Sequence, residues 1–145
     1  MFQHILIATD GSELADKAVN AGLELAHQLD AKVTIATASE PWQAAVGDAA
    51  PAFSFPIAEY DKVVAENAAR ILSTAGAVAK QKGVACETVH VNGFPAEAII
   101  EMAKTRGCDL IVMSSHGRKG VSRLLLGSQA ARVVTLSTIP VLVCR

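Results

Sequence analysis

The sequence predicts an α/β fold in which helices cover both faces of a parallel sheet. Strand-like apolar runs alternate with amphipathic helical segments throughout the 145 residues, giving five strands and four helices. Hydrophobic residues make up 51% of the chain and aromatic residues only 4%, so Ala, Val, Leu and Ile must build the core. That composition suits helices packed on a buried parallel sheet. We expect right-handed β-α-β connections within one domain, residues 1–145.

The first predicted strand and helix meet at a turn. Residues 5–9 are apolar and end in Asp10-Gly11-Ser12, a turn signal. Ser12 is suited to cap the helix that follows. Spacings of three and four residues predict the buried face of this helix: Leu14, Ala18, Ala21, Leu25 and Leu29.

The second predicted strand, 33–38, leads into a long loop at 40–57. This loop contains three of the five prolines, and loops of this length are usually functional lids or mobile segments. Three aromatic residues lie in it, and they either fold back on the domain or meet a partner: Trp42, Phe53 and Phe55.

Two helices and one strand follow the loop. Residues 58–82 predict a long helix that ends at Gly83. Its expected inner face consists of Val64, Ala68, Ile71, Leu72, Ala75 and Val78. Residues 85–91 form the third strand, after which Pro95 opens a short helix.

The last part of the chain predicts two more strands and a helix. Residues 110–113 are a compact apolar run, and a connection rich in glycine and basic residues follows at 114–127. Helix 128–136 and strand 141–144 complete the pattern. Parallel sheets bind ligands beyond the carboxyl ends of their strands, where the winding reverses, so the loops after strands one and four are the candidate site.

Composition argues against several classes of protein. The formal net charge of −1 gives no global attraction to nucleic acid or to an anionic membrane. The N-terminus has no basic leader region and no apolar run approaches about 20 residues, so the cytoplasm is the expected compartment. The three cysteines are far apart, which favours small buried hydrophobic residues over a disulfide framework or a zinc site: Cys86, Cys108 and Cys144.

The connection after the fourth strand has the character of an anion site. Glycines at 117 and 127 let backbone N–H groups approach an oxyanion, and a helix starting at Ser128 offers unpaired donors and a positive dipole end. Arg118, Lys119 and Arg123 add positive charge. The alternative is a solvated loop whose glycines merely make turns. Neither a Walker loop nor the dinucleotide fingerprint is present.

Asp10 is the second candidate, at the end of the first strand. Its carboxylate can accept hydrogen bonds from ribose or adenine or hold a divalent ion, and the alternative is a turn residue that starts the helix. His116 is expected to make a loop hydrogen bond rather than to contact phosphate or act as a base. The remaining histidines show no metal-ligand spacing. With no acid and base paired, we assign no catalytic residue.

These motifs together resemble the universal stress protein family over essentially the whole chain. Nucleotide-binding members carry G-x2-G-x9-G-[ST] after strand four, and here that frame reads Ser114-x2-Gly117-x9-Gly127-Ser128. Residues 5–12 look like the family's first strand and turn, and residues 139–143 look like its last strand.

The resemblance implies an open, adenine nucleotide alpha-hydrolase-like sheet in the order 3-2-1-4-5, with ATP across the ends of strands one and four and Mg²⁺ as an optional companion. Adenosine would contact Ala8, Thr9, Asp10 and Ala38. The ribose and phosphates would then contact Met113, Ser114, Gly117, Arg118, Gly127, Ser128 and Gln129.

The same resemblance implies a homodimer formed by antiparallel pairing of the last strand, with Val141 and Val143 at the interface. Ser114 departs from the motif, because a serine replaces its first glycine and either narrows the site or supplies a hydrogen bond. The expected function is a stress-response module that binds ATP and is read by a partner protein. A nucleotide-free interaction dimer and a slow ATP hydrolase are the alternatives.

Overall fold

A five-stranded parallel sheet in the order β3-β2-β1-β4-β5 forms the centre of the molecule. The computed structural model describes residues 1–41, 47, 56–117 and 125–145. Its elements are β1 His4–Ala8, α1 Glu13–Leu29, β2 Lys32–Ser39, α3 Ile57–Gln81, β3 Cys86–Asn92, α4 Pro95–Thr105, β4 Leu110–Ser114, α5 Ser128–Leu136 and β5 Val141–Cys144. The predicted fold class and strand order are confirmed. The winding reverses between β1 and β4, so a crevice is expected beyond their carboxyl ends.

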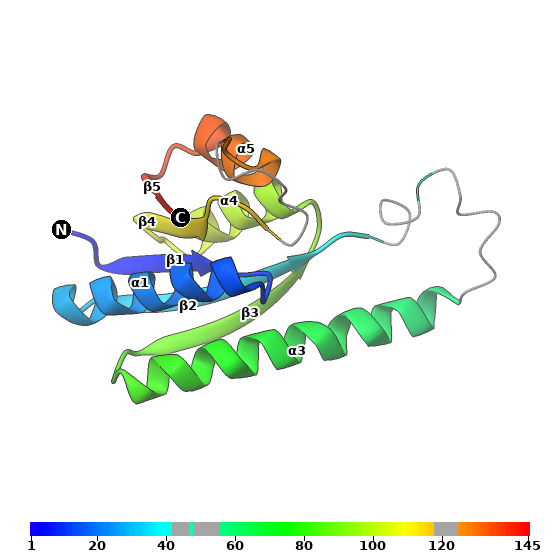
Figure 1. Ribbon diagram of the computed structural model, residues 1–145, viewed down its shortest axis with the longest axis horizontal. Helices are drawn as coiled ribbons and strands as arrows, with labels where there is room; N and C mark the ends of the chain where they lie inside the picture. Colours follow the sequence, from blue (N-terminus) through cyan, green and yellow to red (C-terminus); the bar gives the residue numbers. More distant parts are fainter. Residues whose placement is uncertain (42–46, 48–55, 118–124) are drawn as a thin grey trace.

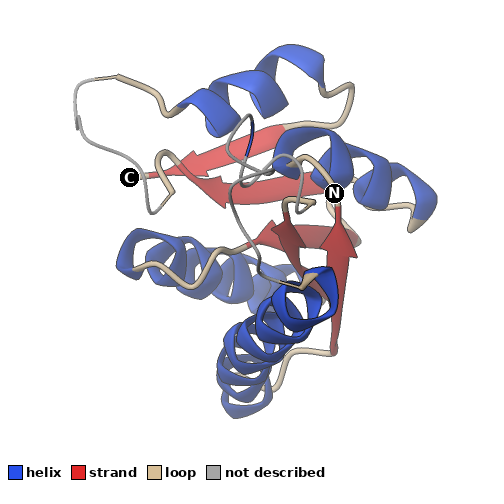
Figure 2. Cartoon of the chain, turned by 90° about the vertical axis from the view of Figure 1, so that its right-hand side faces the viewer, coloured by secondary structure: helices blue, strands red, loops and turns tan. Residues whose placement is uncertain are grey.

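Helices lie on both faces of the sheet (Figures 1 and 2). Ile5 and Ile7 of β1 enter the core cluster under α1 and α3, whereas Leu6 and Ala8 enter the cluster under α4 and α5. Successive side chains of a strand point to opposite faces, which explains this alternation. A buried parallel sheet of this kind favours the near-continuous apolar runs seen in the sequence.

The predicted buried face of α1 was partly wrong. Ala21 is exposed, Leu25 is half-buried and Leu29 is 38% exposed. The buried residues are instead Ala15, Ala18, Val19, Gly22, Leu23 and Ala26. A Cβ atom at Gly22 would lie 2.7 Å from Cδ1 of Ile7, so α1 approaches the sheet most closely at its smallest residues.

The turn between β1 and α1 follows the prediction. Ser12 caps α1 by accepting a hydrogen bond from the N–H of Ala15 at 3.2 Å. Gly11 has φ of 75°, in the left-handed region that glycine adopts without steric cost. The chain therefore leaves β1 and enters α1 within four residues.

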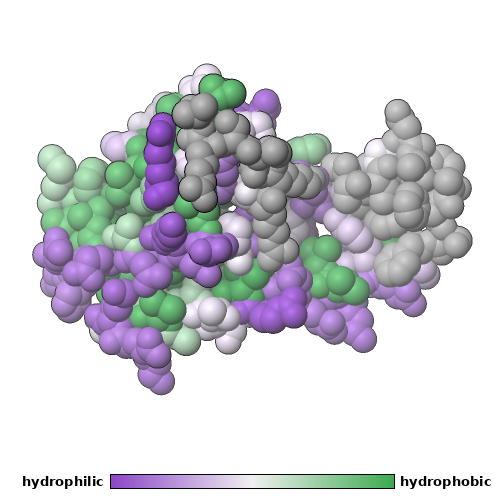
Figure 3. Space-filling view, viewed as in Figure 1, coloured by the Kyte–Doolittle hydropathy of each residue, from purple (hydrophilic) through white to green (hydrophobic). Residues whose placement is uncertain are grey.

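Helix α3 buries part of the face that its sequence predicted: Ala68, Leu72 and Ala75 are buried, whereas Val64, Ile71 and Val78 are half-buried. The prediction missed Ala79, which is also buried. Its N-terminal part extends beyond the strands (Figure 1). Hydrophilic residues dominate the lower part of the face shown in Figure 3, over α1 and α3, with hydrophobic residues between them. The loop aromatic residues Trp42, Phe53 and Phe55 lie outside the described residues.

The three cysteines are free thiols. Cys108 is 6% exposed, as predicted for a small core residue, and burial raises its pKa to about 11. Cys86 and Cys144 are half-buried and pack against the core cluster under α1 and α3. Across the described part of the chain, none of the helices combines the length and hydropathy needed to span a bilayer.

Candidate functional site

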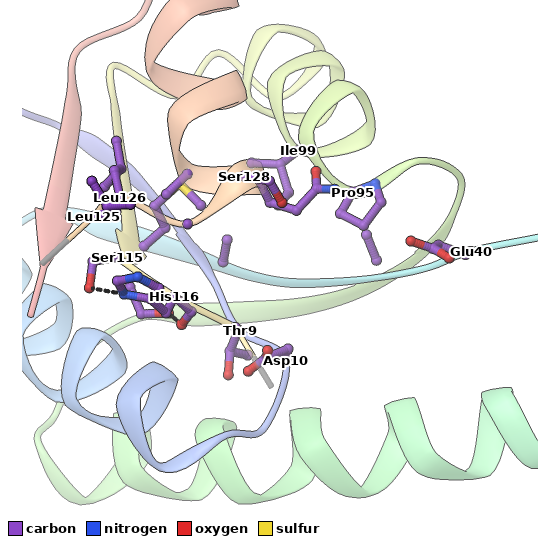
Figure 4. Close-up of a pocket in the computed structure, with 18 of the residues that line it drawn as sticks. Thr9, Asp10, Glu40, Pro95, Ile99, Ser115, His116, Leu125, Leu126 and Ser128 are labelled. Atoms are coloured by element: carbon purple, nitrogen blue, oxygen red, sulfur yellow. Dashed lines mark hydrogen bonds between the residues drawn. The ribbon is translucent and has the colours of Figure 1, made fainter. Parts of the chain in front are cut away.

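A hollow of about 820 Å³ opens beyond the carboxyl ends of β1, β2 and β4 (Figure 4). Every predicted site residue that the structure describes lines it: Ala8, Thr9, Asp10, Ala38, Met113, Ser114, Gly117, Gly127, Ser128 and Gln129. Arg118 lies outside the described residues, as do Lys119 and Arg123. The topology thus brings together segments more than a hundred residues apart in the sequence.

Asp10 lies where the loops after β1 and β4 meet. Its Oδ1 accepts the backbone N–H of Ser12 at 2.9 Å, so the turn role considered for it is present. Its Oδ2 faces Gly117, because a Cβ atom built there would lie only 2.8 Å from that oxygen. One carboxylate therefore shapes the turn into α1 and also forms part of the wall of the hollow.

Gly127 joins the start of α5 to the loop after β4. Its N–H donates to the carbonyl of Ser115 at 2.8 Å, and a Cβ atom would lie 2.7 Å from the same oxygen. The prediction that the amide of Gly127 is open to a phosphate was therefore wrong. Glycine is required because two backbone segments touch here, and its φ of −60° needs no special freedom.

The open donors belong to the residues that follow Gly127. The first bond within α5 runs from the N–H of Ala131 to the carbonyl of Gly127 at 2.9 Å, so the N–H groups of Ser128 and Gln129 have no acceptor inside the helix. The start of α5 has no side-chain cap. A helix N-terminus of this kind favours an anion through both its N–H groups and its dipole.

Ser114 and Ser115 brace the loop that leads to Gly117. Ser114, which replaces the first motif glycine, donates its hydroxyl to the carbonyl of His116 at 2.8 Å. Ser115 Oγ is hydrogen-bonded to Nδ1 of His116 at 3.1 Å, as Figure 4 shows. His116 therefore makes the loop hydrogen bond that was expected of it. Ser114 thus lines the hollow with its hydroxyl bonded to its own loop.

Several lining residues were missed by the sequence interpretation. Apolar surface comes from α4 and from the loop before α5, and further residues come from the end of β2 and the start of α3. These are Glu40, Tyr60, Pro95, Ile99, Leu125 and Leu126, and Ala130 of α5 is a further one. The sequence contained a signal for two of them. Glu40 and Pro95 closely follow predicted strands, so both are expected at the carboxyl edge of the sheet, where ligands bind.

Tyr60 and Glu40 contact each other at the rim of the hollow. The hydroxyl of Tyr60 donates to the backbone carbonyl of Glu40 at 2.9 Å. Burial raises the pKa of Tyr60, and the charges of Glu40 and Asp61 raise it further. The phenol thus stays protonated and donates this bond at neutral pH. The contact joins two residues that the long connection between β2 and α3 separates in the sequence.

The described residues build no metal centre of their own. Among them, no group of three or more His, Cys, Asp or Glu side chains is arranged to hold an ion. A divalent cation at Asp10 would need most of its ligands from water or from a bound phosphate, as is usual for Mg²⁺.

Comparison with known proteins gives a consistent match. The family model described as Universal stress protein family matches residues 1–145. Universal stress protein YxiE of Bacillus subtilis is 35% identical, over 100% of both chains. Protein MJ0577 of Methanocaldococcus jannaschii superposes with a TM-score of 0.84 at 26% identity, over 99% of this chain and 96% of that one. A universal stress protein solved in complex with cAMP gives a TM-score of 0.71 at 29% identity, over 99% and 97%.

Proposed function

The chain belongs to the universal stress protein family, and from this premise we propose that it binds an adenine nucleotide, ATP, in the hollow and acts as a stress-response module. The observation that carries the proposal is the arrangement across the sheet. Ala38 of β2 and the apolar residues Pro95 and Ile99 of α4 line one end, a carboxylate follows β1, and an uncapped helix start lies beyond β4. A nucleotide has the same order of parts: base, ribose and phosphates.

The hollow suits a nucleotide in size. Ligand pockets usually measure about 300–1,000 Å³, and this one measures about 820 Å³. The base would lie beside Ala8 and Ala38, where the backbone approaches without large side chains. The ribose hydroxyls would donate to Asp10, since a carboxylate would repel the phosphates instead. The structure of a relative with cAMP supports an adenine nucleotide as the class of ligand.

The phosphates would lie at the start of α5, with N–H groups of Ser128 and Gln129 as donors. Charge interactions with a helix N-terminus contribute about 0.3–2 kcal/mol each. Micromolar affinity requires about 8 kcal/mol, so several contacts must act together. Glycine at position 117 lets the Asp10 carboxylate keep its place at the wall, because a Cβ atom there would lie 2.8 Å from Asp10 Oδ2. Any Mg²⁺ would arrive with the phosphates.

We further propose that the protein is a cytoplasmic homodimer paired through β5. This strand lies at the edge of the sheet and pairs with β4 in the described structure. Leu142 is 40% exposed, and Val141 and Val143 are half-buried. An apolar edge with unpaired backbone groups favours pairing with another strand, and a second copy supplies one. A partner protein would read nucleotide occupancy from this dimer.

The test is nucleotide analysis of the purified protein. Denaturing the purified protein should release ATP or ADP, which mass spectrometry would detect. ATP at 100 times its Kd should raise the free energy of unfolding by about 2.7 kcal/mol. Protein free of nucleotide that shows no thermal shift with millimolar ATP would support the nucleotide-free dimer instead. The slow-hydrolase alternative requires ATP turnover that Asp10→Ala abolishes while binding remains.

A further inference from the structure

Tyr60 stands out among the residues that line the hollow because neither the nucleotide motif nor the packing of the core accounts for it. It is the only tyrosine of the chain, in a protein with 4% aromatic residues. It lies in the first turn of α3, in the part of that helix that extends beyond the strands. Tyr60 lines the hollow, and its hydroxyl donates a hydrogen bond to the carbonyl of Glu40 at 2.9 Å.

The position of Tyr60 corresponds to the base end of the hollow. Glu40 directly follows β2, and of the three strands whose own residues line the hollow (β1, β2 and β4), β2 lies farthest from β4 and the start of α5. Figure 4 shows Glu40 at one end of the hollow and Leu125 and Leu126 at the other. An anionic group is unsuited to the Glu40 end, because Glu40 is an acidic residue and lines it. A neutral, flat group is the part of a nucleotide that this end favours.

The opposite wall at this end is apolar. Pro95 and Ile99 belong to α4, which covers one face of the sheet, whereas Tyr60 belongs to α3 on the other face. A planar ring entering beyond the end of β2 would thus have an aromatic side chain on one side and aliphatic surface on the other. Aromatic side chains are the usual stacking surfaces for bases.

We infer that Tyr60 is the base-stacking residue of this site, and that its hydrogen bond to the carbonyl of Glu40 holds the ring in position. The inference rests on the proposed function, since it assigns the base end of the same hollow. It divides recognition between two remote helix starts: α3 contacts the base and α5 contacts the phosphates.

Three variants test the inference by calorimetry with ATP. Tyr60→Leu should weaken binding by about 5- to 150-fold, the range expected for loss of one stacked base. Tyr60→Phe keeps the ring and should lose only about 2- to 10-fold, for the missing hydrogen bond. The matched control is Phe94→Leu, which removes a 59% exposed ring outside the hollow and should leave the Kd unchanged. Circular dichroism would confirm that each variant is folded.

A second measurement separates stacking from a merely structural role. Because the chain has one tyrosine, ring-labelled protein gives one set of tyrosine NMR signals. ATP should move these signals upfield by ring current, whereas inorganic tripolyphosphate, which has no base, should not. In a competition experiment with labelled ATP, Tyr60→Leu should leave the inhibition constant of tripolyphosphate unchanged within about threefold.

Two outcomes would overturn the inference while leaving ATP binding intact: unchanged ATP affinity in Tyr60→Leu, or equal losses for ATP and tripolyphosphate. If the wild-type protein binds no nucleotide at all, the proposed function itself fails and this assignment fails with it.

Discussion

The two edges of the sheet differ in how their polar groups are used. At the amino-terminal edge, polar side chains bond one another across the strands: His4 Nε2 to Thr34 Oγ1 at 2.8 Å, Thr34 to Glu87 at 2.9 Å, and Glu87 to Arg106 at 2.5 Å. At the carboxyl edge, the start of α5 has no side-chain cap and opens into a hollow of about 820 Å³. The side chains that bond one another at the first edge stabilise the fold, whereas the first N–H groups of α5, which have no acceptor inside the helix, can bind a ligand.

Each edge also has a carboxylate that accepts backbone N–H groups. Asp109 precedes β4 and accepts the backbone N–H groups of Gln3 and His4, at 2.8 and 3.1 Å. Asp10 follows β1 and uses Oδ1 for Ser12, while Oδ2 lies beside Gly117 at the wall of the hollow. Substitutions at the first edge should change stability alone, whereas substitutions at the second should change binding. Three predictions test this separation.

The largest effect is expected from Gly127→Val. Its Cβ would lie 2.7 Å from the Ser115 carbonyl, so the start of α5 must move away from the loop after β4 and its N–H groups lose their alignment. We expect ATP affinity to fall by at least about 100-fold, or 2.7 kcal/mol, by calorimetry. The control is Gly76→Ala in α3, where a Cβ meets only Thr88 Cγ2 at 3.5 Å. That change should preserve binding and stabilise the helix by about 0.5–1 kcal/mol. Unchanged ATP affinity in Gly127→Val would contradict the separation.

The second prediction concerns the amino-terminal edge. Asp109→Ala removes the acceptor of two backbone N–H groups, one of them on the buried residue His4. Hydrogen bonds to charged groups contribute about 1.5–3 kcal/mol, so the free energy of unfolding should fall by about 2 kcal/mol in urea titrations. The Kd for ATP should stay within about twofold, because this edge is remote from the hollow. A large loss of affinity would show that the two edges are coupled.

The smallest effect is a pH dependence from His4. His4 is 6% exposed. Burial lowers the pKa of its imidazole, as does the charge of Lys32, against the opposing influences of Glu87, the Arg106 backbone and Asp109. Nδ1 is buried without a hydrogen-bond partner in the described structure. Below about pH 6.5 the unfolded chain gains a proton that folded His4 does not, so stability should fall as the pH drops, by at most about 1.4 kcal/mol per unit.

Urea titrations between pH 7 and 5.5 would measure this slope. Glu87 does not interfere, because Arg106 and Thr34 lower its pKa and its contribution is lost only on further acidification, below about 4.5. His4→Gln should flatten the profile. An equally steep profile in that variant would assign the pH dependence to other groups.

Periodicity predicted the sheet and most helices because strand and helix periods differ strongly. It misplaced the buried face of α1, because Ala21, Leu25 and Leu29 were predicted to face the core in place of Gly22, Leu23 and Ala26. Gly22 lies against Ile7, where no Cβ fits, so a residue without a side chain marks the contact with the sheet. The residue volume that fits between a helix and a sheet depends on the distance from the helix axis to the sheet, and a single sequence does not specify that distance.

The motif residues of the site were predicted because they follow strands one and four directly. Tyr60 was missed because it lies in a different helix, beyond a long connection, and only the hydrogen bond to Glu40 places it at the hollow. The role expected for Gly127 was wrong in its detail for a related reason. Spacing indicates where a glycine is needed, but only coordinates show whether ligand or backbone occupies the space.

The buried thiol of Cys108 gives this protein a built-in reporter. With a pKa of about 11, almost none of the thiol is ionised at neutral pH, and electrophiles and peroxide react with the thiolate. In the native protein, Cys108 is therefore protected from oxidants by its raised pKa as well as by its burial. Alkylation at this position would proceed only as fast as the surrounding core opens. The rate of alkylation therefore measures how often the core unfolds locally.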